Sequence, residues 1–368
     1  MSTPSEGATY APQPKPAPVV GPGEFHFAAV RLNHGHIYGM TEGLISAGAT
    51  CTWVYDDDAG RLAAFTDRFP QVQVASSEAE ILADPQVRLV ASAGITSERA
   101  PFGIEVMEAG KDFFVDKAPL TTLDQLAAVR AAVERTGRKY AVYYSERVHV
   151  SAAVLAEDLI AQDAIGRVIQ VMSMGPHRVG DPASRPDWFF EKEKYGGILC
   201  DIGSHNFDQI LAFTGATDAT ITSASIANYG HPEHPGLDDF GDAHVVTDNG
   251  ASGYVRVDWF TPDGLRTWGD GRTFILGTEG YIELRKYVDV AVDVEGPARG
   301  GHVFLVNAAG EQHFEADELV GYPFFGRLIR DCIDRTETAM TQAHALKAAE
   351  LSVLAQLQAR VLESSDSR

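Results

Sequence analysis

Apolar and polar residues alternate along residues 25–144 in a regular rhythm, in which short apolar runs are followed by longer stretches with helical spacing. The runs end at glycine, proline or clustered polar residues, which are typical of the ends of elements. This rhythm predicts a parallel sheet with helices on both faces and a ligand at the carboxyl ends of the strands. The expected strands are 25–32, 50–55, 72–75, 89–93, 113–115 and 140–144, and the expected helices are 41–47, 60–69, 77–83, 97–109 and 122–136.

The rhythm changes after about Val150. Longer runs with period-two alternation follow one another, joined by glycine-rich turns, and this pattern is typical of antiparallel strands. We therefore expect an α/β protein in which a doubly wound parallel sheet precedes an α/β domain with a large, mostly antiparallel open sheet. The expected strands are 168–174, 220–228, 243–247, 253–259, 272–276 and 280–284, and the expected helices are 151–162, 201–215, 324–334 and 343–362.

These patterns divide the chain into a tail at 1–23, a dinucleotide-binding domain at 24–145 and a substrate-binding and oligomerisation domain at 146–368, whose last helices could pack back on the first domain. The tail holds six prolines among small and polar residues, so it cannot bury enough apolar area to offset ordering, and we expect it to be disordered. It lacks the apolar segment of a signal peptide, and no later stretch is long and apolar enough to span a bilayer.

Composition and charge exclude some classes of partner and setting for the protein. Apolar residues make up 45% and charged residues 22% of the chain, which is typical of a globular protein. The formal net charge of −21 argues against partners with phosphate backbones and against anionic membranes, since both attract basic patches. The three cysteines form neither a disulfide framework nor a structural zinc motif, so we expect a reducing, cytoplasmic setting.

The turn after the first strand is a degenerate dinucleotide signature. Asn33-His34-Gly35-His36-Ile37-Tyr38-Gly39 keeps two of the fingerprint glycines, and Asn33 partly replaces a missing one because asparagine tolerates left-handed backbone angles. Asp56 ends the second strand, 21 residues after Gly35, where an acid would bind ribose hydroxyls and repel a 2′-phosphate. The alternative is an Asp-rich turn, Asp56-Asp57-Asp58, that caps the next helix.

Two further motifs carry chemistry. Lys117 follows an apolar strand-like run, and a spacing of four places Asp201 and His205 on one face of a helix. A histidine suits proton transfer because its unperturbed pKa, about 6.5, lies near working pH. Taken singly, Lys117 could equally be a solvated surface residue, Asp201 a helix N-cap and His205 a partly buried structural histidine.

The motifs resemble the glucose-fructose oxidoreductase / inositol dehydrogenase / MocA family of NAD(P)-dependent oxidoreductases. The resemblance extends over most of residues 25–360. It rests on the first strand with its turn and on four segments: Leu82-Ala-Asp-Pro-Gln-Val-Arg-Leu-Val, Gly110-Lys-Asp-Phe-Phe-Val-Asp-Lys-Ala-Pro, Ile165-Gly-Arg-Val, and Gly196-Gly through Asp201-Ile-Gly-Ser-His205-Asn-Phe-Asp208.

The resemblance implies a Rossmann domain, a second domain whose open sheet mediates a homo-oligomer (dimer or tetramer), and hydride transfer between NAD, with NADP as the alternative, and a secondary alcohol of a sugar, inositol or related polyol. His205 would be the general base, Asp201 would orient it or hold a hydroxyl, and Lys117 would stabilise the developing alkoxide. The cofactor-binding residues would be Asn33, Gly35, His36, Ile37, Asp56, Ser97 and Lys117.

Three features of the sequence depart from the family pattern. The family's Glu-Lys-Pro becomes Asp116-Lys117-Ala118-Pro119, the glycine fingerprint is incomplete, and Ser97 and Arg99 stand where the family often has Asn and His. These departures affect the backbone at Lys117, the affinity for the cofactor and the contacts beside the nicotinamide, respectively.

Further candidates for substrate binding have weaker support from the sequence than the motif that contains Asp201 and His205. Aromatic rings stack on sugar rings, and arginine donates hydrogen bonds to hydroxyl groups. The residues that could line a polyol pocket are therefore Tyr144, Arg147, His177, Trp188, Asp201 and His205. Packing in the core or at an interface explains the aromatic residues equally well. The segment with His231, His234 and His244 contains aspartates but no compact metal-binding spacing. We expect a loop at the substrate or subunit interface there and no metal site.

Two other functions stay open. An enzyme with no net redox change, such as one that cleaves glycosides or epimerises sugars, would oxidise and re-reduce its substrate on one bound cofactor. A non-catalytic nucleotide or sugar sensor would tolerate the degraded glycine turn, but it would not need Lys117, Asp201 and His205 together.

Overall fold

The computed structural model describes residues 15–292 and 299–362. The chain separates into two compact units. We call the first the parallel unit, formed by Pro16–Tyr144 and Pro323–Leu346, and the second the mixed unit, formed chiefly by Ser145–Tyr322 and the residues from Lys347 onward. The α/β fold class expected from the sequence is confirmed in both sheets.

The parallel unit is built on a six-stranded sheet in the order β3-β2-β1-β4-β5-β6, the order of doubly wound dinucleotide-binding folds. Every strand pair in it is parallel. The strands are β1 (His26–Val30), β2 (Thr50–Tyr55), β3 (Gln73–Val74), β4 (Val87–Ser92), β5 (Asp112–Asp116) and β6 (Tyr140–Tyr143), and the helices between them are α1 (His36–Ser46), α2 (Ala59–Arg68), α3 (Glu78–Ala83), α4 (Thr96–Glu108) and α5 (Leu123–Thr136).

Helix α1 begins five residues earlier than the sequence pattern predicts. Ile37 and Met40 lie on its buried face together with Leu44, so the apolar stripe extends to the start of the helix. From the C-terminal part of the chain, α12 (Pro323–Asp334) returns to this unit and places the ring of Phe325 against α1. A Cβ atom at Gly43 would lie 2.2 Å from that ring, so glycine is required for the close approach.

The predicted disordered tail is partly wrong. Residues 1–14 lie outside the described residues, but residues 15–23 are described. The Val19 backbone amide donates to the Ala47 carbonyl at 3.0 Å, and Val20 is buried. The backbone of Val19 and the buried side chain of Val20 supply the anchor that the proline-rich composition concealed.

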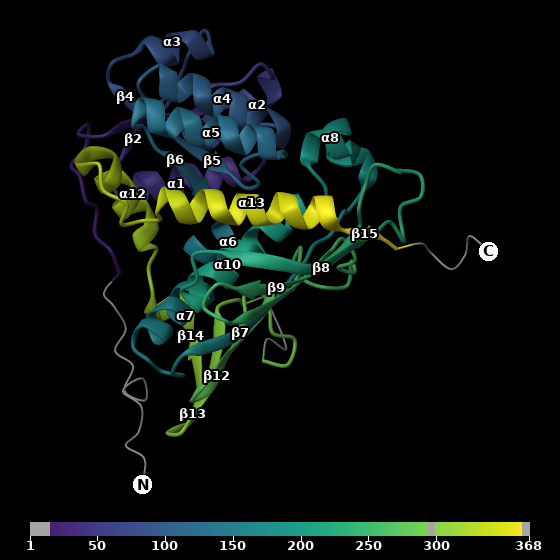
Figure 1. The fold of residues 1–368 in the computed structure, drawn as a ribbon. Helices are drawn as coiled ribbons and strands as arrows, with labels where there is room; N and C mark the ends of the chain where they lie inside the picture. The colour runs from purple at the N-terminus through teal and green to yellow at the C-terminus, as the bar shows by residue number, and fades with distance from the viewer. Residues whose placement is uncertain (1–14, 293–298, 363–368) are drawn as a thin grey trace. The chain divides into compact units, whose positions relative to one another are not determined.

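The mixed unit contains a nine-stranded sheet in the order β14-β13-β12-β11-β7-β10-β9-β8-β15, in which only the β7–β10 and β8–β15 pairs are parallel. Helices α7 (Ser151–Ala161) and α10 (Gly203–Thr214) cover one face of it (Figure 1). The strands are β7 (Val168–Pro176), β8 (Ala219–Ala227), β9 (Phe240–Thr247), β10 (Ser252–Asp258), β11 (Arg272–Gly277), β12 (Gly280–Arg285), β13 (His302–Asn307), β14 (Gly310–Glu315) and β15 (Arg360–Val361).

The sequence pattern missed the β13–β14 hairpin and extended the last helix too far. Strand β14 is mostly exposed, so it carries little of the apolar alternation that reveals a strand. Helix α13 (Gln342–Gln358) ends before Arg360, where the chain adds the edge strand β15 beside β8.

All three cysteines are buried, and none of them forms a disulfide. Among the described residues, no helix combines the length and the apolar character that crossing a membrane would require.

Candidate functional site

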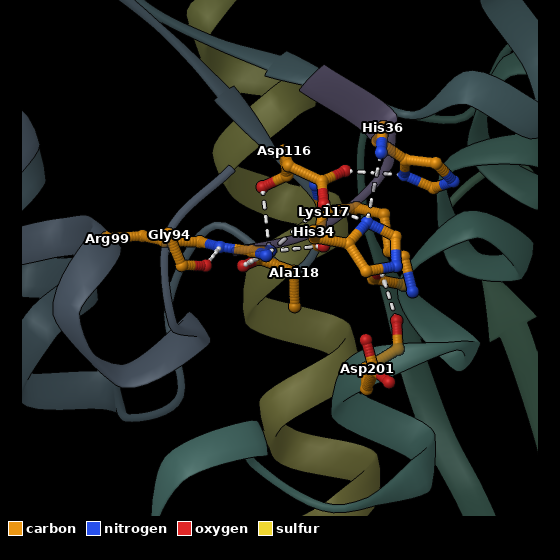
Figure 2. Close-up of polar contacts among 9 residues, drawn as sticks. His34, His36, Gly94, Arg99, Asp116, Lys117, Ala118 and Asp201 are labelled. Carbon is orange, nitrogen blue, oxygen red and sulfur yellow. Dashed lines mark hydrogen bonds and ion pairs between the residues drawn. The ribbon is translucent and has the colours of Figure 1, made fainter. Parts of the chain in front are cut away.

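The buried carboxylate of Asp116, the last residue of β5, is the centre of the polar cluster in the parallel unit (Figure 2). Its Oδ1 accepts hydrogen bonds from the Lys117 backbone amide at 2.8 Å and from His36 Nδ1 at 2.7 Å. Its Oδ2 lies 3.0 Å from His34 Nδ1 and accepts from Arg99 Nη2 at 3.2 Å. Four donors therefore occupy the two oxygens of one carboxylate.

These donors determine the charge of Asp116. Burial alone would raise the pKa of Asp116, but His36, Arg99 and His34 outweigh it and hold the pKa well below the usual range. His34, His36 and Asp116 also have the composition of a metal site. Because the carboxylate oxygens already accept from four donors, and Arg99 brings a positive charge, we interpret the cluster as a hydrogen-bonded group in which Asp116 orients two imidazoles.

Arg99 fixes the turn that carries Lys117. Its guanidinium donates to the backbone carbonyls of Asp116, Lys117 and Ala118 and to the Gly94 carbonyl at 2.7 Å (Figure 2). The side chain is almost completely buried. The sequence marked Arg99 only as a departure from the family pattern; its anchoring role depends on contacts with residues distant in the sequence, so the local sequence gives no signal of it.

The β1–α1 turn differs from the prediction for it. Asn33 does not have a left-handed backbone; Arg31 does, with φ of 56°. This conformation is uncommon for a residue other than glycine, and side-chain contacts hold it here. The Arg31 guanidinium donates to Glu78 at 2.7 Å and stacks over the Phe102 ring at 3.9 Å from its centroid.

Gly35 lies just before α1 and Asp56 directly follows β2, so both lie at the carboxyl edge of the parallel sheet. A Cβ atom at Gly35 would meet nothing within 4 Å, so the turn leaves open space at the N-terminus of α1. Asp56 is buried and accepts from the Leu32 amide at 2.6 Å and from Arg61 Nη2 at 2.7 Å. Burial raises the pKa of Asp56, but these bonds, above all that from Arg61, lower it overall. Ser97 lies in the first turn of α4 and is only half-buried.

In the mixed unit, the predicted helix from Asp201 to Gly215 is divided at Ile202 into α9 (Ile198–Asp201) and α10. The His205 amide bonds to the Ile202 carbonyl at 3.1 Å, and the Ser204 hydroxyl donates to the Asp201 carbonyl at 2.7 Å. The chain therefore tightens between Asp201 and His205 instead of forming one continuous α-helix.

The two glycines before α9 are needed for the turn that starts it. Gly196 and Gly197 both have left-handed backbones, with φ of 93° and 89°. A Cβ atom at Gly197 would lie 2.2 Å from the side chain of Gln356. The motif Gly196-Gly197 thus has a steric cause that the sequence alone did not provide.

A buried polar layer lies behind His205, between α10 and the sheet. Lys286, just after β12, donates from Nζ to Glu146 Oε2 at 2.7 Å and to Gln209 Oε1 at 2.8 Å. Gln209 Nε2 in turn donates to the His205 carbonyl at 2.9 Å. Burial raises the pKa of Glu146, but Lys286, with smaller contributions from His205 and His177, lowers it far below its usual value. The sequence analysis missed Glu146 and Lys286.

Two of the predicted substrate-binding residues have structural partners instead. The Tyr144 hydroxyl donates to the Ala345 carbonyl at 3.0 Å in the parallel unit. Arg147, in the short helix α6 (Ser145–Val148), forms a buried two-bond ion pair with Asp208, at 2.7 and 2.8 Å, and also bonds Glu157. Their polar atoms therefore stabilise the fold, and we correct their assignment to the polyol pocket.

The other two candidates stay predictions. His177 follows β7, packs edge-on against Trp259, and its Nδ1 lies 3.1 Å from the Gly175 carbonyl. Trp188 lies half-buried in a short 3-10 helix (Asp187–Phe190).

The three histidines of the 231–244 segment serve separate functions. His231 Nδ1 lies 3.0 Å from Asp239 Oδ2, His234 stacks on Phe190, and His244 packs against Tyr254 on β10. Asp239 also accepts from two backbone amides, so it organises the loop.

Comparisons with known proteins agree with this architecture. A family model described as the GFO/IDH/MocA C-terminal domain matches residues 154–283. The NAD(+)-dependent scyllo-inositol 2-dehydrogenase of Bacillus subtilis is 28% identical over 239 residues, which cover 63% of this chain and 61% of that protein.

Solved structures extend the comparison. A protein from Erwinia carotovora atroseptica SCRI1043 is 50% identical, with a TM-score of 0.88 over 92% of this chain and 100% of its own. Levoglucosan dehydrogenase in complex with NADH shares the fold at 19% identity, with a TM-score of 0.73 over 89% of this chain and 95% of its own. The two sheets define a two-unit α/β oxidoreductase scaffold. The chain belongs to the GFO/IDH/MocA family.

Replacing Asp116 tests the carboxylate cluster. In Asp116→Asn the amide would direct N–H groups at donors that need an acceptor, and we expect a loss of about 3 kcal/mol in the free energy of unfolding at pH 7. Because the folded pKa is depressed, the stabilisation by Asp116 is complete above the unfolded pKa of about 3.9 and declines as pH falls below it. The difference between the variant and the wild type should therefore shrink below about pH 4 in urea unfolding followed by circular dichroism.

Asp57→Asn is the matched control, since that side chain is exposed and, among the described residues, forms an ion pair only with Arg61, and its effect should stay within about 0.5 kcal/mol. If Asp116→Asn lowered the free energy of unfolding by the same amount at both ends of the pH range, the effect would come from packing, and this result would contradict the role of the Asp116 charge.

Proposed function

We propose that this protein is an NAD(P)-dependent dehydrogenase that oxidises a secondary alcohol of a sugar, inositol or related polyol. One observation carries the proposal: Lys117 follows β5, an inner strand of a dinucleotide-type sheet, on a turn whose three carbonyls are fixed by Arg99. A catalytic cation at the carboxyl edge of such a sheet lies where bound ligands are found. The relatives named for inositol and levoglucosan dehydrogenation support the substrate class.

The residues of the parallel unit fit a dinucleotide. The N-terminus of α1 beside Gly35 would accept the pyrophosphate, with Asn33, His36 and Ile37 around it, because the helix dipole favours an anion there. Asp56 would bind the ribose hydroxyls. Ser97 and Lys117 would lie beside the nicotinamide.

The bound nicotinamide supplies the hydride acceptor. His205 would take the proton of the substrate hydroxyl while the carbon loses hydride, and Asp201 would orient the imidazole and stabilise its charged form. Lys117 would hydrogen-bond the reacting oxygen and stabilise its developing negative charge. His177 and Trp188 are the remaining candidates for contacts with the polyol.

Removing Lys117 tests the mechanism. In Lys117→Ala, kcat should fall by about 10²- to 10³-fold while the Kd for NAD changes little, because the ammonium group acts on charge that develops in the transition state. Calorimetric titration with NAD and a spectrophotometric screen of sugars and inositols for NADH formation provide the two measurements.

Lys194→Ala removes an exposed ammonium that, within the described part of the chain, forms an ion pair only with Glu191, and it should leave both quantities unchanged. Normal turnover in Lys117→Ala would contradict the mechanism. A wild-type protein that binds NAD and turns over substrate without net NADH would instead indicate the class of enzymes with no net redox change.

The choice between NAD and NADP depends on Asp56 and Arg61. In the structure Arg61 neutralises Asp56, and both lie where the 2′ position of a bound adenosine ribose would be expected. Arg61→Ala should leave the Asp56 carboxylate unneutralised beside the ribose, so the ratio of the Kd for NADP to the Kd for NAD should rise about tenfold. Asp56→Ala removes that carboxylate and should lower the same ratio. Calorimetry with both cofactors measures it, and equal shifts in both variants would contradict the assignment.

We also propose a homo-oligomer, a dimer or tetramer, that forms through the sheet of the mixed unit. Cross-strand neighbours on the face opposite α10 expose apolar side chains: Met172 pairs with Phe274 and Leu276 with Tyr281, each between 37% and 42% exposed. Exposed apolar patches of this kind mark association surfaces.

A charged residue in this patch should prevent association. Phe274→Asp combined with Leu276→Asp should convert the oligomer to a monomer in sedimentation velocity, because burying two carboxylates in an apolar interface is unfavourable. Leu357→Asp, at an exposed position on α13, should leave the sedimentation coefficient unchanged. A monomeric wild type would refute the proposal.

A further inference from the structure

The Lys286–Glu146 ion pair behind α10 has no role in the chemistry described so far. Both side chains are almost fully buried, with 0% and 3% of their surface exposed. Burying two charges costs several kcal/mol even when they are paired, and a well-packed apolar pair would often serve stability as well or better. Simple packing therefore does not explain why this position holds two charged groups.

The pair is connected to His205 through one residue. Gln209 lies one helical turn after His205 and uses both ends of its amide: the oxygen accepts from Lys286 Nζ, and the nitrogen donates to the His205 carbonyl. The oxygen of the amide is also within 3.4 Å of the Thr273 hydroxyl on β11. The first turn of α10, and with it His205, is thereby fixed to the inner face of the sheet.

We propose that Glu146 and Lys286 form a buried charge pair that positions His205 through Gln209 and sets its strength as a proton acceptor. The proposal rests on the proposed function, in which His205 is the general base. Glu146 supplies a negative charge that favours the protonated imidazole, and Lys286 limits that effect while it holds Gln209 in place. Both are positioning residues, because they act through His205 and not on the substrate.

Several other charged groups of the mixed unit bear on His205. Asp201 lies on α9, immediately before the break in the helix, and His177 follows β7. Asp208 lies on α10 itself and is neutralised by Arg147, which also bonds Glu157. Because these groups stay unchanged in variants of the pair, differences between such variants report on Glu146 and Lys286.

The two members of the pair should have opposite effects on titration. Loss of the negative charge in Glu146→Gln should lower the pH midpoint of the His205 imidazole by about 1 pH unit, and loss of the positive charge in Lys286→Met should raise it. The midpoint is measured by carbon-13 NMR of histidine-labelled protein, with the His205 signal assigned by its absence in His205→Asn. The acid limb of kcat/KM against pH should move in the same directions, and its plateau should fall about tenfold in Glu146→Gln.

Two further variants keep the test decisive. Glu146→Asp retains the charge and should keep the midpoint near that of the wild type. The double variant Glu146→Gln/Lys286→Met leaves no unpaired buried charge, so it provides a folded neutral reference if a single variant does not fold. Glu157→Gln removes the half-exposed carboxylate on the far side of Arg147 and serves as the matched control, with an unchanged midpoint.

The outcomes of the titration and of the activity assay decide different questions. Midpoints that stay unchanged, or that shift in the same direction in Glu146→Gln and Lys286→Met, would overturn the proposal and leave the pair a structural element. The NMR titration needs no turnover, so it is independent of the proposed function. Full activity of His205→Asn would refute the assignment of His205 as the base, whatever the titration shows.

Discussion

The parallel unit depends on one buried carboxylate. An ionised group withdrawn from water costs several kcal/mol unless its lone pairs are satisfied, and Asp116 meets this condition with donors from three parts of the chain: the β1–α1 turn, helix α4 and the backbone of its own turn. The same contacts that stabilise its charge therefore bring the nucleotide-type turn and the Lys117 turn into one cluster. The hydrogen bonds of Asp116 thus both stabilise the parallel unit and determine the geometry of the cluster.

The mixed unit follows the same principle with a different arrangement. Its polar layer includes a lysine, a glutamate and a glutamine between an amphipathic helix and the inner face of a sheet, where apolar residues would be simpler to accommodate. Nearby, the Arg147–Asp208 ion pair connects α6 to α10. Because buried polar networks tolerate few alternative arrangements, they hold the start of α10 in a defined position.

The sequence predicted the parallel sheet almost strand by strand, since β1, β4, β5 and β6 are mostly buried runs between polar ends. It failed where side chains determine the geometry. A hairpin with an exposed strand left little periodic signal, the break at Ile202 depends on a serine hydroxyl and a three-residue turn, and Tyr144 and Arg147 found partners more than fifty residues away in the sequence. Lys117 and His205 could be named from local motifs, but Arg99, Glu146 and Lys286 could not, because their roles arise from long-range burial.

The left-handed backbone of Arg31 has a consequence for how such chains are recognised. A glycine at this place would leave the unfolded turn more conformations to lose, whereas arginine restricts it and secures the folded form through Glu78 and Phe102. The turn is thus specified by side chains that lie outside it. A search that requires glycine wherever the backbone is left-handed would miss this turn, because arginine occupies that place.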